Sequence, residues 1–81
     1  MNVRVLAFAR VREALGFTER TIELPAGATA ADAWNSLAQT VVALQGLATS
    51  TRLARNGTVV DGAAALQEGD ELAFLPPVGG G

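Results

Sequence analysis

The sequence of 81 residues contains no cysteine, no histidine, no tyrosine and no lysine, and all six of its basic residues are arginines. Without cysteine and histidine the chain has no disulfide, no thiolate nucleophile, no Ser–His pair and none of the ordinary ligands of zinc or iron–sulfur sites. Carboxylates and arginines remain, and no two carboxylates have a spacing that would bring them together for acid–base chemistry. We therefore expect no catalytic side chain, no metal site and no bound cofactor.

The charge balance is mildly acidic, with a net charge of −2 and a pI near 4.8. Proteins that bind nucleic acid rely on clustered lysine and arginine, so a nucleic-acid partner is not expected. No apolar stretch approaches the roughly 20 residues that span a bilayer, and the first residues do not resemble a signal peptide. With 49% hydrophobic residues the chain is typical of one small globular domain. We expect a cytoplasmic protein without a membrane partner.

The N-terminal third of the chain is predicted to form two strands joined by a short helix or turn. Residues 3–8 are β-branched and apolar with one charge, which is typical of a central strand. Residues 9–15 have a helix-forming composition, and Gly16 stands where a left-handed helix cap belongs. Residues 18–24 show a period of two, which predicts a half-exposed strand that ends at Pro25.

The main helix is expected over residues 30–44. Thr29 followed by Asp32 resembles a capping box, with aspartate in place of the usual glutamate. The apolar residues that then recur at helical spacing are Trp34, Leu37, Ala38 and Val41. We interpret Trp34, the only tryptophan, as a core residue of this apolar stripe.

The C-terminal half is expected to contain three strands. Asn56-Gly57 lies between two β-forming runs and is the strongest short signal for a hairpin. The predicted elements, in order, are a loop over residues 46–51, strands over 52–55 and 58–60, one helical turn over 63–66 and a last strand over 71–75. Pro76-Pro77 ends the last strand because proline has no amide hydrogen to donate to a sheet.

The order β, β, α, β, β, β with one main helix favours an α+β fold, in which the helix packs on one face of a small mixed sheet. The arrangement ββαββ is that of the β-grasp fold, in which the last strand lies parallel beside the first. We expect residues 1–75 to form this β-grasp domain. Residues 76–81 are expected to form a flexible C-terminal tail, because three consecutive glycines bury nothing and lose much backbone entropy on ordering.

The tail sequence Pro76-Pro77-Val78-Gly79-Gly80-Gly81 has no evident role in the core. It is either a frayed end or a projecting segment with a task of its own. Six extended residues reach about 20 Å, more than the radius of gyration of about 12 Å expected for such a domain, so the Gly81 carboxylate can enter the active site of another protein. Glycine suits this task because a chain without Cβ passes a narrow slot and leaves the terminal carbonyl open on both faces. A carboxylate becomes a good electrophile only after activation, for example as an acyl-adenylate.

Three segments together carry a family resemblance, namely residues 5–13, the Arg55-Asn56-Gly57 hairpin and residues 68–81. The last segment reads G-D-E, an apolar strand, Pro-Pro, an aliphatic residue, a variable residue and Gly-Gly. Over essentially its whole length the chain resembles the MoaD family, the small sulfur-carrying subunit of molybdopterin synthase, within the MoaD/ThiS ubiquitin-like proteins. Gly79 fills the variable position, and Gly80-Gly81 match the terminal pair.

The resemblance implies that an E1-like enzyme uses ATP to adenylate Gly81 and that a sulfur donor protein converts the adenylate to a thiocarboxylate. The tail, residues 76–81, would then be inserted into the large subunit of molybdopterin synthase. There the sulfur passes to cyclic pyranopterin monophosphate in molybdenum cofactor biosynthesis, within a heterotetramer of two small and two large subunits. The same resemblance implies that Arg12, Val59 and Leu75 contact the activating enzyme or the large subunit.

Strand alternation adds an argument for two of these docking residues. If Phe74 lies in the core, Leu75 faces away from the helix, and one of Val59 and Val60 must also face outward. Apolar residues on the uncovered face of the sheet are either a docking patch or ordinary scattered surface aliphatics.

Other functions remain open at this point. A ThiS-like carrier for thiamine thiazole or for tRNA thiolation would use the same tail chemistry, and a ubiquitin-like protein modifier would join its tail to protein amines. The Pro76-Pro77 step and the Phe74-Leu75 strand end favour the molybdopterin carrier. The absence of lysine either protects the chain from acylation by its own activated terminus or reflects genome composition.

Overall fold

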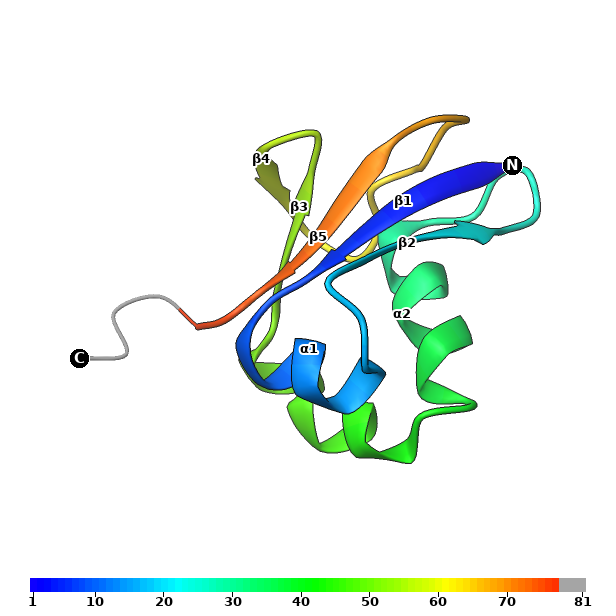
Figure 1. Cartoon of the computed structure of the whole chain (residues 1–81). Coiled ribbons are helices and arrows are strands. Elements are labelled where there is room, and N and C mark those ends of the chain that lie inside the picture. The colour runs from blue at the N-terminus through cyan, green and yellow to red at the C-terminus, as the bar shows by residue number, and fades with distance from the viewer. Residues whose placement is uncertain (78–81) are drawn as a thin grey trace.

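The computed structural model describes residues 1–77 of the chain. Its elements, in chain order, are β1 (Asn2–Ala7), α1 (Ala9–Leu15), β2 (Glu19–Glu23), α2 (Ala30–Ala38), the 3₁₀ helix η1 (Val42–Ser50), β3 (Arg52–Arg55), β4 (Thr58–Val60) and β5 (Glu71–Leu75). The strands form one sheet in the order β2-β1-β5-β3-β4, and the helices lie on one side of it (Figure 1). No helix within residues 1–77 is long and apolar enough to cross a bilayer.

The last strand, β5, lies at the centre of the sheet between β1 and β3. It runs parallel to β1, with Ala7 opposite Phe74, and antiparallel to β3, with Arg52 opposite Leu75. β1 also pairs antiparallel with β2, and β3 pairs antiparallel with β4. The parallel pairing of the first and last strands confirms the predicted β-grasp fold.

The core forms between the sheet and α2. Val3, Val5 and Ala7 of β1 are almost completely buried, as the period of two requires for a strand with one covered face. Phe74 of β5 is fully buried, and its ring meets that of Trp34 edge to face, with centroids 5.0 Å apart and planes at 82°. Trp34 is a core residue as predicted, and the burial of Phe74 meets the condition under which Leu75 faces away from the helix. Burial of a phenylalanine side chain contributes about 1.5–3 kcal/mol.

The start of α2 follows the prediction. Thr29 Oγ1 accepts a hydrogen bond from the Asp32 amide (3.2 Å), and Asp32 Oδ2 accepts one from the Thr29 amide (2.9 Å). These two bonds complete a capping box and satisfy amide groups that an uncapped helix leaves without partners.

The end of α2 does not follow the prediction. The helix ends at Ala38, so the predicted extension to residue 44 is wrong. Residues 40–42 are Thr-Val-Val, and β-branched side chains lose rotamer freedom in a helix. The chain forms η1 in place of the predicted loop over residues 46–51, and Leu44 of η1 is fully buried.

The helical turn predicted over residues 63–66 is also absent. Ala65 instead forms an isolated β-bridge with Thr29. The preceding Gly62 carbonyl accepts a hydrogen bond from the Ala31 amide (2.9 Å) at the start of α2. Backbone groups of this segment therefore bond to the first turn of α2 and its cap, which a turn of helix bonded within itself would not allow.

Candidate functional site

The tail is attached at the carboxyl end of β5, in the middle of the sheet. Pairing with β1 and β3 holds β5 along its length from Glu71 to Leu75. Pro76 and Pro77 follow as exposed residues that cannot donate to a sheet. The remaining predicted tail residues lie outside the described part of the chain, and these are Val78, Gly79, Gly80 and Gly81.

A shallow pocket of about 50 Å³ lies at the base of the tail. Three segments that are distant in sequence meet there, namely the start of α1, the end of η1 and the two prolines. The lining includes Phe8, Arg10, Leu47, Ser50, Pro76 and Pro77. α1 begins here with Ala9 at a φ of 50°, which is uncommon for a residue with a Cβ, so packing around the turn must hold it in place.

The face of the sheet turned away from α2 carries an apolar row across four strands. Leu6 of β1 lies opposite Ala73 of β5. Ala54 of β3 lies between Ala73 and Val59 of β4. Leu75 shares this face because it lies two residues after Ala73 in the same strand. We call these five residues the outer apolar face.

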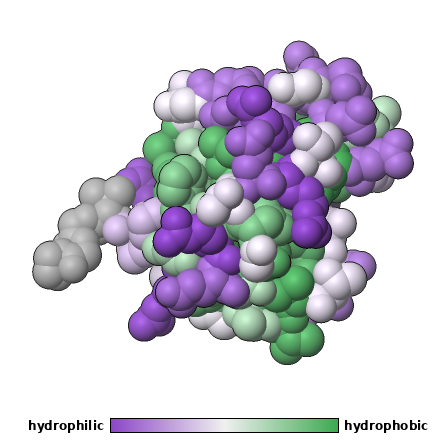
Figure 2. All heavy atoms as spheres, viewed as in Figure 1, coloured by the Kyte–Doolittle hydropathy of each residue, from purple (hydrophilic) through white to green (hydrophobic). Residues whose placement is uncertain are grey.

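The outer apolar face contains two of the three predicted docking residues. Val59 is 50% exposed and Leu75 is half-buried. Arg12 is exposed in α1, whose first turn lines the pocket at the tail base, and it is not part of the sheet. On the side of the molecule drawn in Figure 2, apolar residues reach the surface between groups of polar ones. The docking role of all three residues stays a prediction.

Sequence reasoning missed one exposed aromatic residue, Phe8. It is 40% exposed and lines the pocket at the tail base. The signal was present in the sequence, because Val5 and Ala7 alternate into the core. Leu6, and Phe8 in its extended conformation (φ −131°, ψ 154°), then fall on the opposite side of the strand.

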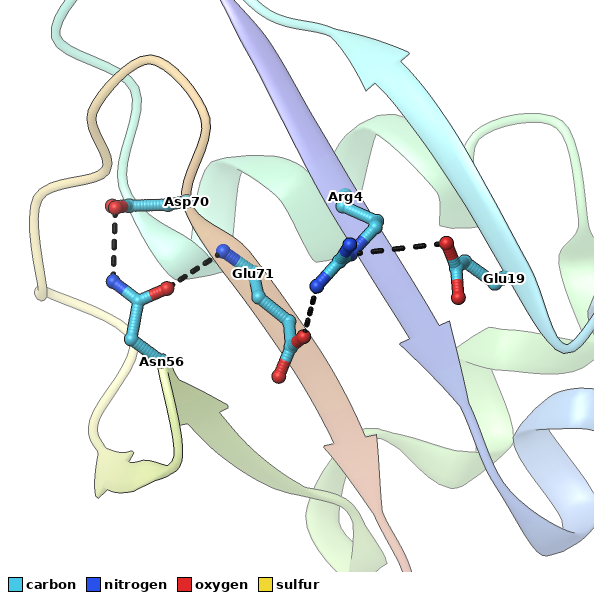
Figure 3. Close-up of polar contacts among 5 residues, drawn as sticks. All are labelled: Arg4, Glu19, Asn56, Asp70 and Glu71. Atoms are coloured by element: carbon cyan, nitrogen blue, oxygen red, sulfur yellow. Dashed lines mark hydrogen bonds and ion pairs between the residues drawn. The ribbon is translucent and has the colours of Figure 1, made fainter.

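A charged group on the outside of the sheet links the three strands β2, β1 and β5 (Figure 3). Arg4 of β1 is hydrogen-bonded and ion-paired to Glu71, its register partner on β5, and lies 3.8 Å from a carboxylate oxygen of Glu19 on β2. The hydrogen bond that Arg4 donates to Glu71 and the negative charge of both carboxylates raise the pKa of Arg4 above its usual value. Because the group is exposed, each ion pair contributes little stability.

A second polar group joins the β3–β4 hairpin to the turn before β5 (Figure 3). Asn56, at a φ of 50°, donates from Nδ2 to Asp70 Oδ1 (3.0 Å) and accepts at Oδ1 from the Glu71 amide (2.9 Å). Asp70 also accepts a hydrogen bond from the Gln67 amide (2.8 Å). These bonds lower the pKa of Asp70, the side chain of Asn56 having the largest effect.

The acidic turn at residues 68–71 therefore has a structural explanation. Its Asp70 and Glu71 side chains are held by Asn56 and Arg4, and Glu68 accepts a hydrogen bond from the Asn2 amide (2.9 Å). Within the described part of the chain, no three acidic groups are placed to hold a metal ion. The G-D-E sequence fixes the start of the strand that carries the tail.

The sequence matches the ThiS family over residues 5–81. A protein named molybdopterin synthase sulfur carrier subunit from Arabidopsis thaliana is 33% identical over 81 residues, covering 100% of this chain and 84% of that protein. The protein of the same name from Chlamydomonas reinhardtii is 36% identical over 83 residues, covering 100% of both chains.

Among solved structures, the fold is similar to that of a putative molybdopterin converting factor subunit 1 from Pyrococcus furiosus, with a TM-score of 0.87 and 29% identity over 96% of this chain and 99% of that one. Small archaeal modifier protein 1 from Haloferax volcanii gives a TM-score of 0.83 and 28% identity over 95% and 98% of the two chains. A complex of subunits 1 and 2 of the molybdopterin-converting factor from Helicobacter pylori shares the fold at 23% identity, with a TM-score of 0.71 and 100% of both chains covered. The family match and the full-length relatives confirm the resemblance seen in the sequence motifs, and the chain belongs to the ThiS family.

Proposed function

We propose that the protein is a sulfur carrier for molybdopterin synthesis and that the carboxylate of Gly81 is the group that carries the sulfur. The observation that best supports this is the position of β5, the central strand, whose end leads directly into Pro76 and Pro77. A tail attached to a strand that is paired on both sides leaves the domain at a fixed place relative to the outer apolar face. The full-length relatives are named as sulfur carrier subunits of molybdopterin synthase.

The chemistry at the terminus comes from other proteins, because the sequence contains no cysteine, histidine or lysine. An E1-like enzyme joins the Gly81 carboxylate to the α-phosphate of ATP and releases pyrophosphate. A sulfur donor protein then supplies sulfur at the oxidation level of sulfide to the acyl carbon, AMP leaves and the thiocarboxylate remains. ATP is used by the activating enzyme, and the carrier needs no bound cofactor of its own.

The sulfur acceptor is cyclic pyranopterin monophosphate in the large subunit of molybdopterin synthase. A protein of the same fold from Helicobacter pylori forms a complex with subunit 2 of the molybdopterin-converting factor, and an equivalent complex is part of this proposal. The proposed assembly is a heterotetramer of two small and two large subunits in the cytoplasm. Residues 76–81 enter the large subunit, the sulfur passes to the substrate, and water restores the Gly81 carboxylate for the next cycle.

The outer apolar face is the docking surface in this proposal. Val59 and Leu75 lose water when a partner covers them, and burial of apolar area favours binding by about 25 cal/mol per Å². Arg12 adds a charged contact from α1. The same surface meets the activating enzyme and the large subunit in turn, because both must receive the same tail.

A second candidate function is protein modification. It is favoured by the similarity to small archaeal modifier protein 1, whose name describes a modifier. A modifier would form an amide between its terminal carbonyl and an amine of a target protein, with loss of AMP from the same acyl-adenylate. A carrier for thiamine thiazole or tRNA thiolation remains the third candidate, since it shares the family and the tail chemistry.

Reconstitution separates these functions. The protein, the activating enzyme, the sulfur donor and the large subunit of the same organism are combined with ATP and cyclic pyranopterin monophosphate. The proposal expects molybdopterin from the full-length chain and none from a variant that lacks Gly81, with the same thermal unfolding for both. Amide-linked adducts without molybdopterin would assign the protein as a modifier. Activity only with the thiazole or tRNA enzymes would assign it to one of those pathways.

A further inference from the structure

The arginines of the chain divide into two groups by the contacts of their side chains within residues 1–77. Three have partners inside the protein. Arg4 pairs with the carboxylates of Glu19 and Glu71. The Arg20 guanidinium lies 4.5 Å from the centre of the Phe17 ring, and Arg55 donates a hydrogen bond to the Ala65 carbonyl (2.7 Å). The others, Arg10, Arg12 and Arg52, are exposed and make no side-chain ion pair or hydrogen bond with the described residues. Arg10 and Arg12 belong to α1, whose first turn lines the pocket at the tail base, and Arg52 begins β3 opposite Leu75.

Two of them flank the base of the tail. Arg10 lines the same pocket as Pro76 and Pro77. Arg52 is the register partner of Leu75, the last residue of β5, and the Cα atoms of such an antiparallel pair lie about 4.5–5.5 Å apart. We call Arg10 and Arg52 the tail-base arginines.

The segments around the tail-base arginines supply almost no compensating charge. The pocket lining and η1 contain no aspartate or glutamate. Glu13 of α1 is the acidic residue nearest to Arg10 in sequence, and Glu19 is already engaged by Arg4. The whole chain has a net charge of −2, so the basic tail end contrasts with an acidic body.

We propose that the tail-base arginines bind carboxylates at the rim of the large-subunit cleft that receives the tail, an inference that rests on the proposed function. The acidic body of the domain repels an acidic rim, whereas the tail-base arginines attract it. The two arginines therefore orient the tail toward the cleft as the two proteins approach each other. The phosphates of ATP do not fit as the ligand. Six residues span at most about 20 Å, and with the tail extended into the activating enzyme its base would lie that far from the Gly81 carboxylate on which ATP acts.

The test is a calorimetric titration of the large subunit with Arg10→Glu, Arg52→Glu and, as a matched control, Arg20→Glu. Each substitution changes the net charge by the same amount, but Arg20 lies on β2 against Phe17, and β1 separates β2 from the tail-bearing strand β5. In about 0.05 M salt we expect each tail-base variant to bind about five- to tenfold more weakly than the wild type, and the control less than twofold. In about 0.5 M salt the losses should fall below about twofold, because screening removes exposed charge attraction.

Equal binding by all variants, an equal loss in the control, or a loss that does not depend on salt would each overturn the inference. The tail-base arginines are exposed, so the substitutions should leave thermal unfolding nearly unchanged. Molybdopterin formation by the wild type tests the proposed function separately. If the wild type binds the large subunit but no molybdopterin forms, the proposed function is refuted, while the titration still decides the role of the arginines. No binding by the wild type refutes both.

Discussion

The ring of Trp34 on α2 meets the ring of Phe74 on β5 edge to face, with centroids 5.0 Å apart. This contact joins the main helix to the strand that carries the tail. Phe74 is fully buried, and the next residue but one is the first proline of the tail. The packing of the core and the position of the tail therefore depend on the same strand.

Truncation of Phe74 should destabilise the whole domain. Phe74→Ala removes a buried aromatic side chain and leaves a cavity against Trp34, which costs about 3–5 kcal/mol of unfolding free energy. Phe74→Leu keeps most of the side-chain volume but loses the aromatic pair, which lowers the unfolding free energy by about 1–2 kcal/mol. Urea denaturation measures both. Phe8→Ala serves as the control, because Phe8 is 40% exposed, and a loss as large as that of Phe74→Ala would contradict this view of the core.

Asp70 should make the stability depend on pH at the acidic end. Its hydrogen bonds to Asn56 and the Gln67 amide lower its pKa from the usual 3.8, so the folded state holds the carboxylate more strongly than the unfolded state does. The contribution of the Asp70 carboxylate to the free energy of unfolding is complete above the pKa that Asp70 has in the unfolded state. It is lost as the pH falls through the pKa of Asp70 in the folded state. The stability difference between the wild type and Asp70→Asn should therefore be constant above about pH 5 and shrink as the pH falls below about 4. A difference that grows toward low pH would contradict the sign of this shift.

Much of the fold can be predicted from the sequence because its signals are local. The β-branched run in β1, the Asn56-Gly57 hairpin and the Thr29–Asp32 capping box each act within a few residues, and the structure contains all three. Helix periodicity is misleading after Ala38, because Val41 and Leu44 continue the apolar spacing although Val41 precedes η1 and Leu44 belongs to it. Residues 63–66 were mispredicted because their partners lie at the start of α2, far away in sequence.

The candidate site is harder to predict because it depends on how strands pair. Leu75 and Val59 share a face only through the register of β5, β3 and β4. Position 67 illustrates the same limit. Gln67 is close to the tail in sequence, but it precedes β5 and so lies at the opposite end of that strand from Leu75. Ser50, which lines the pocket with both prolines, is the position beside the tail.

A charge on the outer apolar face should block docking without unfolding the domain. Val59→Asp places a carboxylate where a partner would remove water, and we expect binding to the large subunit to weaken more than about tenfold. Val42→Asp is the matched control, since Val42 is 69% exposed and lies on η1, away from that face. Calorimetry measures binding and thermal unfolding measures stability. Equal losses in both variants would show that the outer apolar face is not the docking surface.

A lysine beside the tail should react with the activated terminus. The wild type has no lysine, and the amine of Met1 donates to the Leu24 carbonyl (2.6 Å) at the far end of the sheet. After incubation with ATP and the activating enzyme, Ser50→Lys should form an amide within the chain and lose one water, since attack within one molecule has a high effective concentration. Gln67→Lys is the control and should form much less of this amide. Intact mass distinguishes them, and no product from Ser50→Lys would leave genome composition as the reason for the missing lysines.

Gly81 is the residue proposed to carry sulfur, and the intact mass of the protein shows whether sulfur has been added. The full-length chain is incubated with ATP, the activating enzyme and the sulfur donor of the same organism, and the variant without Gly81 is treated in parallel. We expect a gain of about 16 Da in the full-length chain, because one carboxylate oxygen is replaced by sulfur, and no gain in the variant. An unchanged mass of the full-length chain in the presence of active enzymes would contradict the proposal, as would the same gain in the variant.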